Sequence, residues 1–128
     1  MLLKNLIRYI SKDKRNINIS GISTDSKKIK KNYIFFAIRG KKFNGEKFIK
    51  EAVYKGASVI VCSKSCKIRD KSTLIIKTNK IRDLLSYVAS NFYNSKPQNI
   101  IAVTGTNGKT SVSDLFYPIL RINQISAA

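Results

Sequence analysis

The residue types best suited to chemistry lie in a glycine-bracketed segment near the end of the chain. An apolar run at 100–103 leads into this segment, which consists of Gly105, Thr106, Asn107, Gly108, Lys109, Thr110 and Ser111. The two glycines allow the backbone to turn sharply and to present N–H groups to an anion. A helix that starts near Lys109 directs its positive N-terminal end at the same anion. The pattern therefore predicts a buried strand, a phosphate-binding loop and a helix.

Two side chains of this loop are predicted to contact the phosphates of a nucleotide and a magnesium ion. Lys109 can reach the β- and γ-phosphates, and Thr110 offers a hydroxyl to the magnesium ion. The loop is shorter than the common pattern G-x-x-x-x-G-K-[ST], because Val103 stands where the first glycine of that pattern belongs. An ordinary Gly-Asn turn is the alternative interpretation. It would explain both glycines, but it would not explain why Lys109 and Thr110 follow them.

Composition describes a folded protein with a large excess of positive charge. The chain has 128 residues, is 43% hydrophobic and carries a formal net charge of +18, with no histidine. Such a charge is common in proteins that bind nucleic acid. However, the lysines are spread along the whole chain, and Lys, Ile and Asn are elevated together, as an A+T-rich coding sequence would produce. We therefore expect no specific nucleic-acid partner.

The cysteines and the apolar segments indicate a cytoplasmic protein without a membrane partner. Cys62 and Cys66 are the only cysteines, and without histidine they cannot complete a zinc site. Their C-x-x-x-C spacing differs from the redox motif, so we expect buried, reduced thiols in a reducing cytosol. Residues 1–10 lack the cleavage site of a signal peptide, and no stretch approaches the about 18 consecutive apolar residues of a membrane span.

Strand and helix patterns alternate over the first 95 residues, which predicts an α/β domain at 1–95. Apolar periodicity predicts helices at 2–10, 48–53 and 81–92, and strands at 17–22, 33–38, 58–62 and 73–77.

Residues 98–128 are predicted to begin a second domain. They supply the strand at 100–103, the loop, and a helix over about 109–122 that contains Pro118. One strand and one helix cannot bury their apolar faces alone, because a parallel sheet needs neighbouring strands and cover on both faces. We therefore expect a truncated chain.

Two motifs in fixed order resemble the amino-terminal part of the Mur ligases. The first is Thr24-Asp25-Ser26-Lys27, followed by Ile-Phe-Phe-Ala-Ile-Arg-Gly at 34–40 and by Asn44-Gly45. The second is Phe92-Tyr93, then Pro97, then the phosphate loop, whose shorter form is the rule in this family. Lys27 stands where the family usually has arginine, and Asn44 where it has aspartate. Thr106 favours the branch that adds the third peptide residue over the branch that adds D-alanyl-D-alanine, whose loop usually carries serine.

The resemblance implies an ATP-dependent ligase of peptidoglycan precursor synthesis. Such a ligase joins a diamino acid to UDP-N-acetylmuramoyl-L-Ala-D-Glu through an acyl phosphate, with ATP and Mg²⁺. Residues 1–95 would form the small mixed α/β domain that binds the UDP-sugar, and 98–128 the start of a truncated central ATPase domain of the P-loop type. The implied contacts to the UDP-sugar are Thr24, Ser26, Lys41, Lys42 and Phe43.

The resemblance also limits what this chain can do alone. It places the remaining metal ligands and the amino-acid pocket in domains outside these 128 residues. We therefore expect a monomer without ligase activity, and the sequence does not specify the diamino acid.

Three other functions are compatible with parts of the pattern. They are the D-alanyl-D-alanine-adding ligase, a non-catalytic module that binds nucleotide sugars, and a basic nucleic-acid binder. The last is the least favoured, because no aromatic-basic stacking motif is present.

Overall fold

The computed structural model describes residues 1–7, 10–40, 43–93 and 100–124. The chain divides into two compact units, Met1–Asn94 and Ser95–Ala128. Within the described ranges, every helix is too short or too polar to traverse a lipid bilayer.

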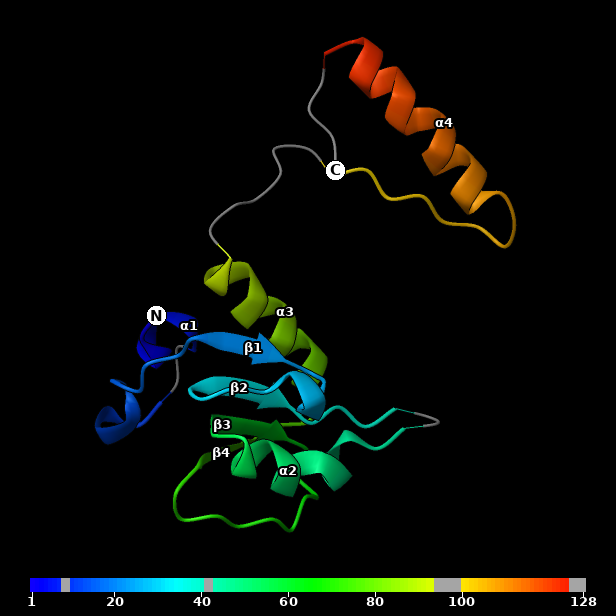
Figure 1. Cartoon of the computed structure of the whole chain (residues 1–128). Helices are drawn as coiled ribbons and strands as arrows, with labels where there is room; N and C mark the ends of the chain where they lie inside the picture. Colours follow the sequence, from blue (N-terminus) through cyan, green and yellow to red (C-terminus); the bar gives the residue numbers. More distant parts are fainter. Residues whose placement is uncertain (8–9, 41–42, 94–99, 125–128) are drawn as a thin grey trace. The chain divides into compact units, whose positions relative to one another are not determined.

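A parallel four-stranded sheet forms the centre of the first unit (Figure 1). Its strands are β1 (Gly21–Ser23), β2 (Tyr33–Phe36), β3 (Ala57–Cys62) and β4 (Leu74–Lys77), and they lie side by side in chain order. All neighbouring pairs are parallel. The carboxyl ends of the four strands therefore share one edge of the sheet, which confirms the α/β prediction.

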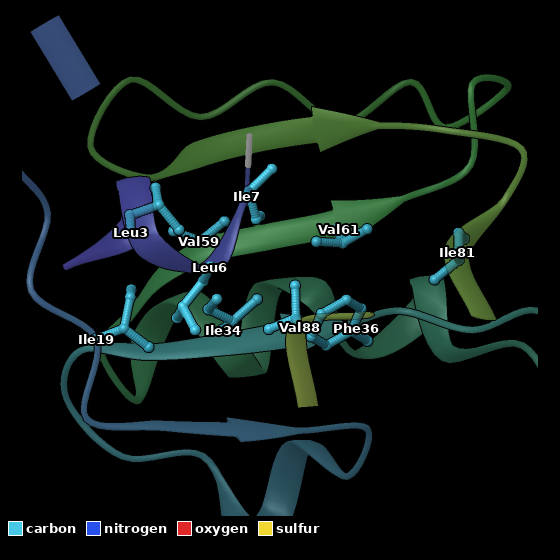
Figure 2. Close-up of a cluster of buried hydrophobic side chains, with 10 residues drawn as sticks. All are labelled: Leu3, Leu6, Ile7, Ile19, Ile34, Phe36, Val59, Val61, Ile81 and Val88. Atoms are coloured by element: carbon cyan, nitrogen blue, oxygen red, sulfur yellow. The ribbon is translucent and has the colours of Figure 1, made fainter. Parts of the chain in front are cut away.

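Helices cover both faces of this sheet, and alternate side chains of the strands face each layer. On one face, α1 (Leu3–Leu6) and α3 (Ile81–Phe92) pack on the sheet in the cluster drawn in Figure 2. On the other face lie the 3₁₀ turn η3 (Gly45–Phe48) and α2 (Ile49–Tyr54). The first cluster includes Ile34, Phe36, Val59 and Val61 of the sheet, and the second includes Phe35, Ala37, Ile60 and Cys62.

The connections between strands explain this distribution of helices. Ile29 follows the 3₁₀ turn η2 (Ser26–Lys28) between β1 and β2, and it is buried on the α2 face. The β2–β3 connection is η3 with α2, and the β3–β4 loop places Cys66 on the same face. Parallel crossovers are right-handed, so strands in chain order keep every connection on one face. The elements outside the crossovers, α1 and α3, cover the opposite face.

Most predicted elements are confirmed, but two at the amino terminus are confirmed only in part. The strand predicted at 17–22 begins later than expected, since β1 spans Gly21–Ser23. Ile19 is buried and its N–H donates to Met1 O at 2.7 Å, so residues 17–19 contact the amino terminus and do not extend β1. The helix predicted at 2–10 spans only Leu3–Leu6, because Ile7 has extended backbone angles; residues 8–9 lie outside the described ranges.

The second unit contains the predicted helix but not the predicted strand. Helix α4 spans Lys109–Ile122 and runs through Pro118. Residues 100–103 form no strand, and Ile100 and Ile101 are 80% and 62% exposed. A parallel strand needs a neighbour to pair its backbone groups, and the described residues of this unit provide none. The strand prediction at 100–103 therefore fails in this structure.

Candidate functional site

The loops after β1 and β2 lie next to each other at the carboxyl edge of the sheet. In open α/β sheets, ligands bind outside the carboxyl ends of the strands. The loop after β1 carries Thr24 and Ser26, and the hairpin after β2 carries Phe43. The structure thus brings these three predicted residues to one edge, while Lys41 and Lys42 lie outside the described residues.

The loop after β1 is a compact turn held by its own side chains. Ser23 Oγ donates to Asp25 O at 3.0 Å and accepts from the Asp25 N–H at 2.9 Å. Asp25 Oδ1 accepts from the Lys27 N–H at 2.9 Å and so caps η2. Thr24 is exposed at the turn. The local hydrogen bonds therefore present Thr24 to solvent in a fixed backbone conformation.

Ser26 is largely buried at the start of η2, where it contacts two residues that sequence reasoning missed. Ser26 is only 6% exposed, and its Oγ donates to Glu51 Oε2 at 2.8 Å. Lys55 Nζ donates to Glu51 Oε1 at 2.6 Å and to Ser26 O at 3.2 Å. The hydrogen bonds from Lys55 and Ser26 hold the pKa of the Glu51 carboxyl below its usual range. The i,i+4 spacing of Glu51 and Lys55 was the one available signal.

The hairpin after β2 displays an aromatic pair. The Gly40 N–H donates to Phe43 O at 2.7 Å, and the Gly45 N–H donates to Ile38 O at 2.9 Å. Phe43 is 67% exposed and stacks on Phe48, with ring centroids 5.4 Å apart and an interplanar angle of 7°. The pair provides an exposed planar surface on which another ring can stack.

Glu46, in η3, forms hydrogen bonds with the loop after β3. Its Oε1 accepts from the Ser63 N–H at 3.0 Å and from the Ser63 hydroxyl. Beside this contact, Cys62 and Cys66 are buried and free, as predicted. Burial, and next the contact with Cys66, raises the pKa of the Cys62 thiol to about 12. A thiol with this pKa is protonated and unreactive at neutral pH.

The predicted phosphate loop leads directly into α4. Gly108 is the N-cap of the helix and has φ +76°, in the left-handed region that favours glycine. A Cβ at this position would meet no atom within 4 Å. The backbone conformation, and not lack of space, is therefore the reason for glycine at 108.

The side chain of Lys109 lies over the loop in which it is expected to hold phosphate. Its Nζ donates to Gly105 O, and to Thr106 O at 3.4 Å. Residues 105–111 are all exposed and include no carboxylate. The first N–H groups of a helix have no partner within it, so those of α4 are available to an anion. The donors present fit a phosphate group.

Few side chains near the predicted phosphate loop could bind a metal ion in the part of the chain that the structure describes. Thr110, at the start of α4, offers one hydroxyl. Across the described ranges, no three His, Cys, Asp or Glu residues are grouped so that they could hold a metal ion. Among the described residues of the phosphate loop and α4, Thr110 is thus the one predicted to contribute a ligand to Mg²⁺.

A separate pocket of about 470 Å³ lies at the opposite edge of the sheet. It is lined by residues at the amino ends of β2, β3 and β4, among them Asn32, Ala57 and Leu74, and also by Asp70. None of the predicted site residues lines it. Residues at this end of the sheet can therefore serve as controls in mutagenesis of the candidate site.

The first unit is a parallel α/β sheet with loops gathered at the carboxyl ends of its strands, and the second contains the predicted phosphate loop and helix α4. Residues 18–106 match the pattern of the Mur ligase family, catalytic domain. The chain belongs to the Mur ligase family.

Similar proteins are named as ligases or synthetases of UDP-N-acetylmuramoyl peptides. The UDP-N-acetylmuramoyl-L-alanyl-D-glutamate–2,6-diaminopimelate ligase 2 of Clostridium acetobutylicum is 40% identical over 113 residues, which are 87% of this chain and 23% of that protein. The corresponding ligase of Clostridium tetani is 42% identical over 123 residues, 93% of this chain and 25% of that protein. The UDP-N-acetylmuramyl-tripeptide synthetase of Borrelia garinii is 37% identical over 122 residues, 92% of this chain and 24% of that protein. The chain thus spans about a quarter of the length of these relatives.

Solved structures of the same family share the fold. The MurF ligase from Thermotoga maritima in complex with ADP has a TM-score of 0.61 and 27% identity, over 78% of this chain and 23% of that one. The UDP-N-acetylmuramoylalanyl-D-glutamyl-2,6-diaminopimelate–D-alanyl-D-alanyl ligase from Acinetobacter baumannii has a TM-score of 0.61 and 25% identity, over 80% of this chain and 23% of that one.

Proposed function

We propose that this chain is part of the ATP-dependent ligase that adds a diamino acid to UDP-N-acetylmuramoyl-L-Ala-D-Glu. The observation that carries the proposal is the 37–42% identity to relatives named for this step, over nearly the whole chain. The likeness to D-alanyl-D-alanine-adding ligases is lower, at 25–27% identity, and so it does not favour that alternative.

In this proposal, residues 1–95 bind the UDP part of the nucleotide-sugar substrate. Thr24 and Ser26 on the loop after β1 and Phe43 on the hairpin after β2 contact the nucleoside. Lys41 and Lys42 face the diphosphate, because ammonium groups form charge-assisted hydrogen bonds with phosphate oxygens. The adjacency of the two loops at the carboxyl edge supports this role.

Residues 98–128 begin the ATP-binding domain, with 105–111 as the phosphate loop. Backbone N–H groups hold the phosphate oxygens, and Lys109 neutralises charge on the γ-phosphate during transfer. Thr110 holds Mg²⁺, which supplies further charge neutralisation when it is bound. The ADP named for the Thermotoga maritima relative supports an adenine-nucleotide ligand.

The chemistry is the formation of an amide bond in two steps. The carboxylate of the precursor attacks the γ-phosphate of ATP, which gives an acyl phosphate and ADP. The amino group of the diamino acid then attacks the acyl carbon, and inorganic phosphate leaves. We place this reaction in the cytoplasm and expect a monomer that has no ligase activity as the 128-residue chain alone.

A chimeric enzyme tests the function. This chain replaces the matching segment of the Clostridium tetani ligase, and ADP release and product are measured with UDP-N-acetylmuramoyl-L-Ala-D-Glu and diaminopimelate or lysine. We expect turnover that is lost in the same chimera with Lys109→Ala. The same segment is also exchanged into the Acinetobacter baumannii D-alanyl-D-alanyl ligase. Turnover of UDP-N-acetylmuramoyl-tripeptide with D-alanyl-D-alanine by that chimera, and none by the Clostridium tetani chimera, would favour the alternative ligase. Binding of UDP without any effect of ATP would favour a non-catalytic module.

A further inference from the structure

A single ion pair lies directly behind the loop that carries Thr24 and Ser26. The chain has 25 Lys and Arg residues and 7 Asp and Glu residues. Within the described part of the chain, the one side-chain ion pair joins Glu51 and Lys55 of the α2 region at 2.6 Å. Most cations of this chain have no acidic residue to pair with. The one acidic residue that does form an ion pair within the described ranges, Glu51, lies next to the loop of the candidate UDP site.

This pair holds Ser26 by both its side chain and its main chain. Glu51 Oε2 accepts from Ser26 Oγ, while Lys55 Nζ donates to Ser26 O. Glu51 and Lys55 also bond to each other, so the three residues form a closed triangle of hydrogen bonds. Residues 24–27 are therefore anchored to α2 in addition to the local bonds of Ser23 and Asp25.

The chemistry of the carboxylate fixes the direction of the Ser26 hydrogen bond. An ionised carboxylate only accepts hydrogen bonds, whereas a serine hydroxyl has one proton and two acceptor lone pairs. Because Ser26 gives its proton to Glu51, its oxygen can act toward a ligand only as an acceptor. The network thus determines both the position and the hydrogen-bonding character of Ser26.

We propose that Glu51, supported by Lys55, is a positioning residue of the nucleotide-sugar site that acts through Ser26. The inference rests on the proposed function of residues 1–95. It adds a residue outside the recognised motifs, and it states that the Ser26 oxygen meets an N–H or O–H donor of the nucleotide. Preorganisation of this kind strengthens binding, because the loop does not lose conformational freedom when the ligand arrives.

The test is a double-mutant cycle with UDP as the ligand. The affinity of the 128-residue chain for UDP is measured by isothermal titration calorimetry for wild type, Glu51→Ala, Ser26→Ala and the double variant. We expect Glu51→Ala to weaken UDP binding about tenfold, the equivalent of about 1.4 kcal/mol, which is near the lower end of the range for one hydrogen bond to a charged group. In the Ser26→Ala background the same change should have little further effect, since coupled residues are non-additive. Glu51→Gln keeps an oxygen that accepts from Ser26 and should recover part of the affinity.

Asp70→Ala is the matched control. The Asp70 carboxylate also accepts from a serine hydroxyl and from backbone N–H groups, but it lies at the opposite edge of the sheet. Its loss should lower the thermal midpoint and leave UDP affinity unchanged.

Two results would overturn the inference while leaving the proposed function in place. One is wild-type UDP affinity in Glu51→Ala, and the other is an equal loss of affinity with and without Ser26, which is the behaviour of a purely structural residue. If circular dichroism shows that Glu51→Ala is unfolded, Glu51→Leu takes its place in the cycle, because leucine fills the space but cannot accept from Ser26. Unchanged UDP affinity in Glu51→Leu then overturns the inference. Failure of the wild-type chain to bind UDP would remove both this inference and the UDP-sugar assignment.

Discussion

Replacing Gly45 by alanine should disrupt the hairpin that carries Phe43. A Cβ at this position would lie 2.7 Å from Ile38 O, 2.9 Å from Ile38 N and 3.1 Å from Ala37 C. These are backbone atoms that cannot rotate away, so the hairpin itself must move. The Gly45 N–H donates to Ile38 O at 2.9 Å, and this bond would be strained by the shift. Forced contacts of this kind typically cost about 1–3 kcal/mol of unfolding free energy.

Gly40→Ala in the same hairpin is the internal control. Its Cβ would meet only Phe43 O, at 3.4 Å, which is close to an ordinary contact. Since alanine also restricts the unfolded chain, this variant should be neutral or gain up to about 1 kcal/mol. The same mutation thus has opposite expected effects a few residues apart.

Urea unfolding followed by far-UV circular dichroism compares the two variants, because the chain has no tryptophan to serve as a fluorescent probe. UDP affinity is measured in parallel, and we expect it to fall only in Gly45→Ala. Equal unfolding free energies for the two variants would refute the argument, since the steric distances would then have no energetic consequence.

Three further predictions address titration, protection and thiol reactivity. Because the pKa of Glu51 is lowered in the folded chain, its contribution to stability is present above its ordinary pKa of 4.5 and is lost as pH falls through the lower folded value. Glu51→Gln should therefore make the free energy of unfolding in urea less sensitive to acid. Unchanged acid sensitivity would contradict this. Limited proteolysis should cut within 98–128 first, because the described residues there bury no hydrophobic side chain, and a uniformly resistant chain would be evidence against it. Iodoacetamide at pH 7 should modify Cys62 far more slowly in the folded chain than in urea, since burial raises its pKa to about 12; equal rates would show that the thiol is accessible.

Helices with strong periodicity were predictable from sequence, because their pattern records burial on one side. Helix α3 matches the predicted range 81–92, and α4 begins at Lys109 as expected. Ile17 and Ile19 show the limit of the same reasoning. Their alternation with polar residues does reflect burial of Ile19, but the segment contacts Met1 and Leu3 through backbone hydrogen bonds and is not paired in the sheet. Alternation does not reveal which segment is the partner.

The candidate site was predictable only in part, for a similar reason. Thr24 and Phe43 follow strands that turn out to be neighbours, so chain position alone placed them at one edge. Ser26 and Glu51 are 25 positions apart, and their hydrogen bond depends on how α2 packs on the sheet. The strand predicted at 100–103 requires pairing partners that the local sequence does not specify.

The order of strands has a consequence for how the first unit folds. Each strand pairs with the strand next to it in the chain, so no pairing in the sheet joins strands that are distant in the sequence. A nascent polypeptide can therefore extend the sheet by one crossover at a time as synthesis proceeds. Helix α3, the last element of this unit, packs against α1, the first. The apolar layer between α1 and α3 cannot form until the ribosome has released α3. Until then this apolar face of the sheet is exposed and can associate with other chains.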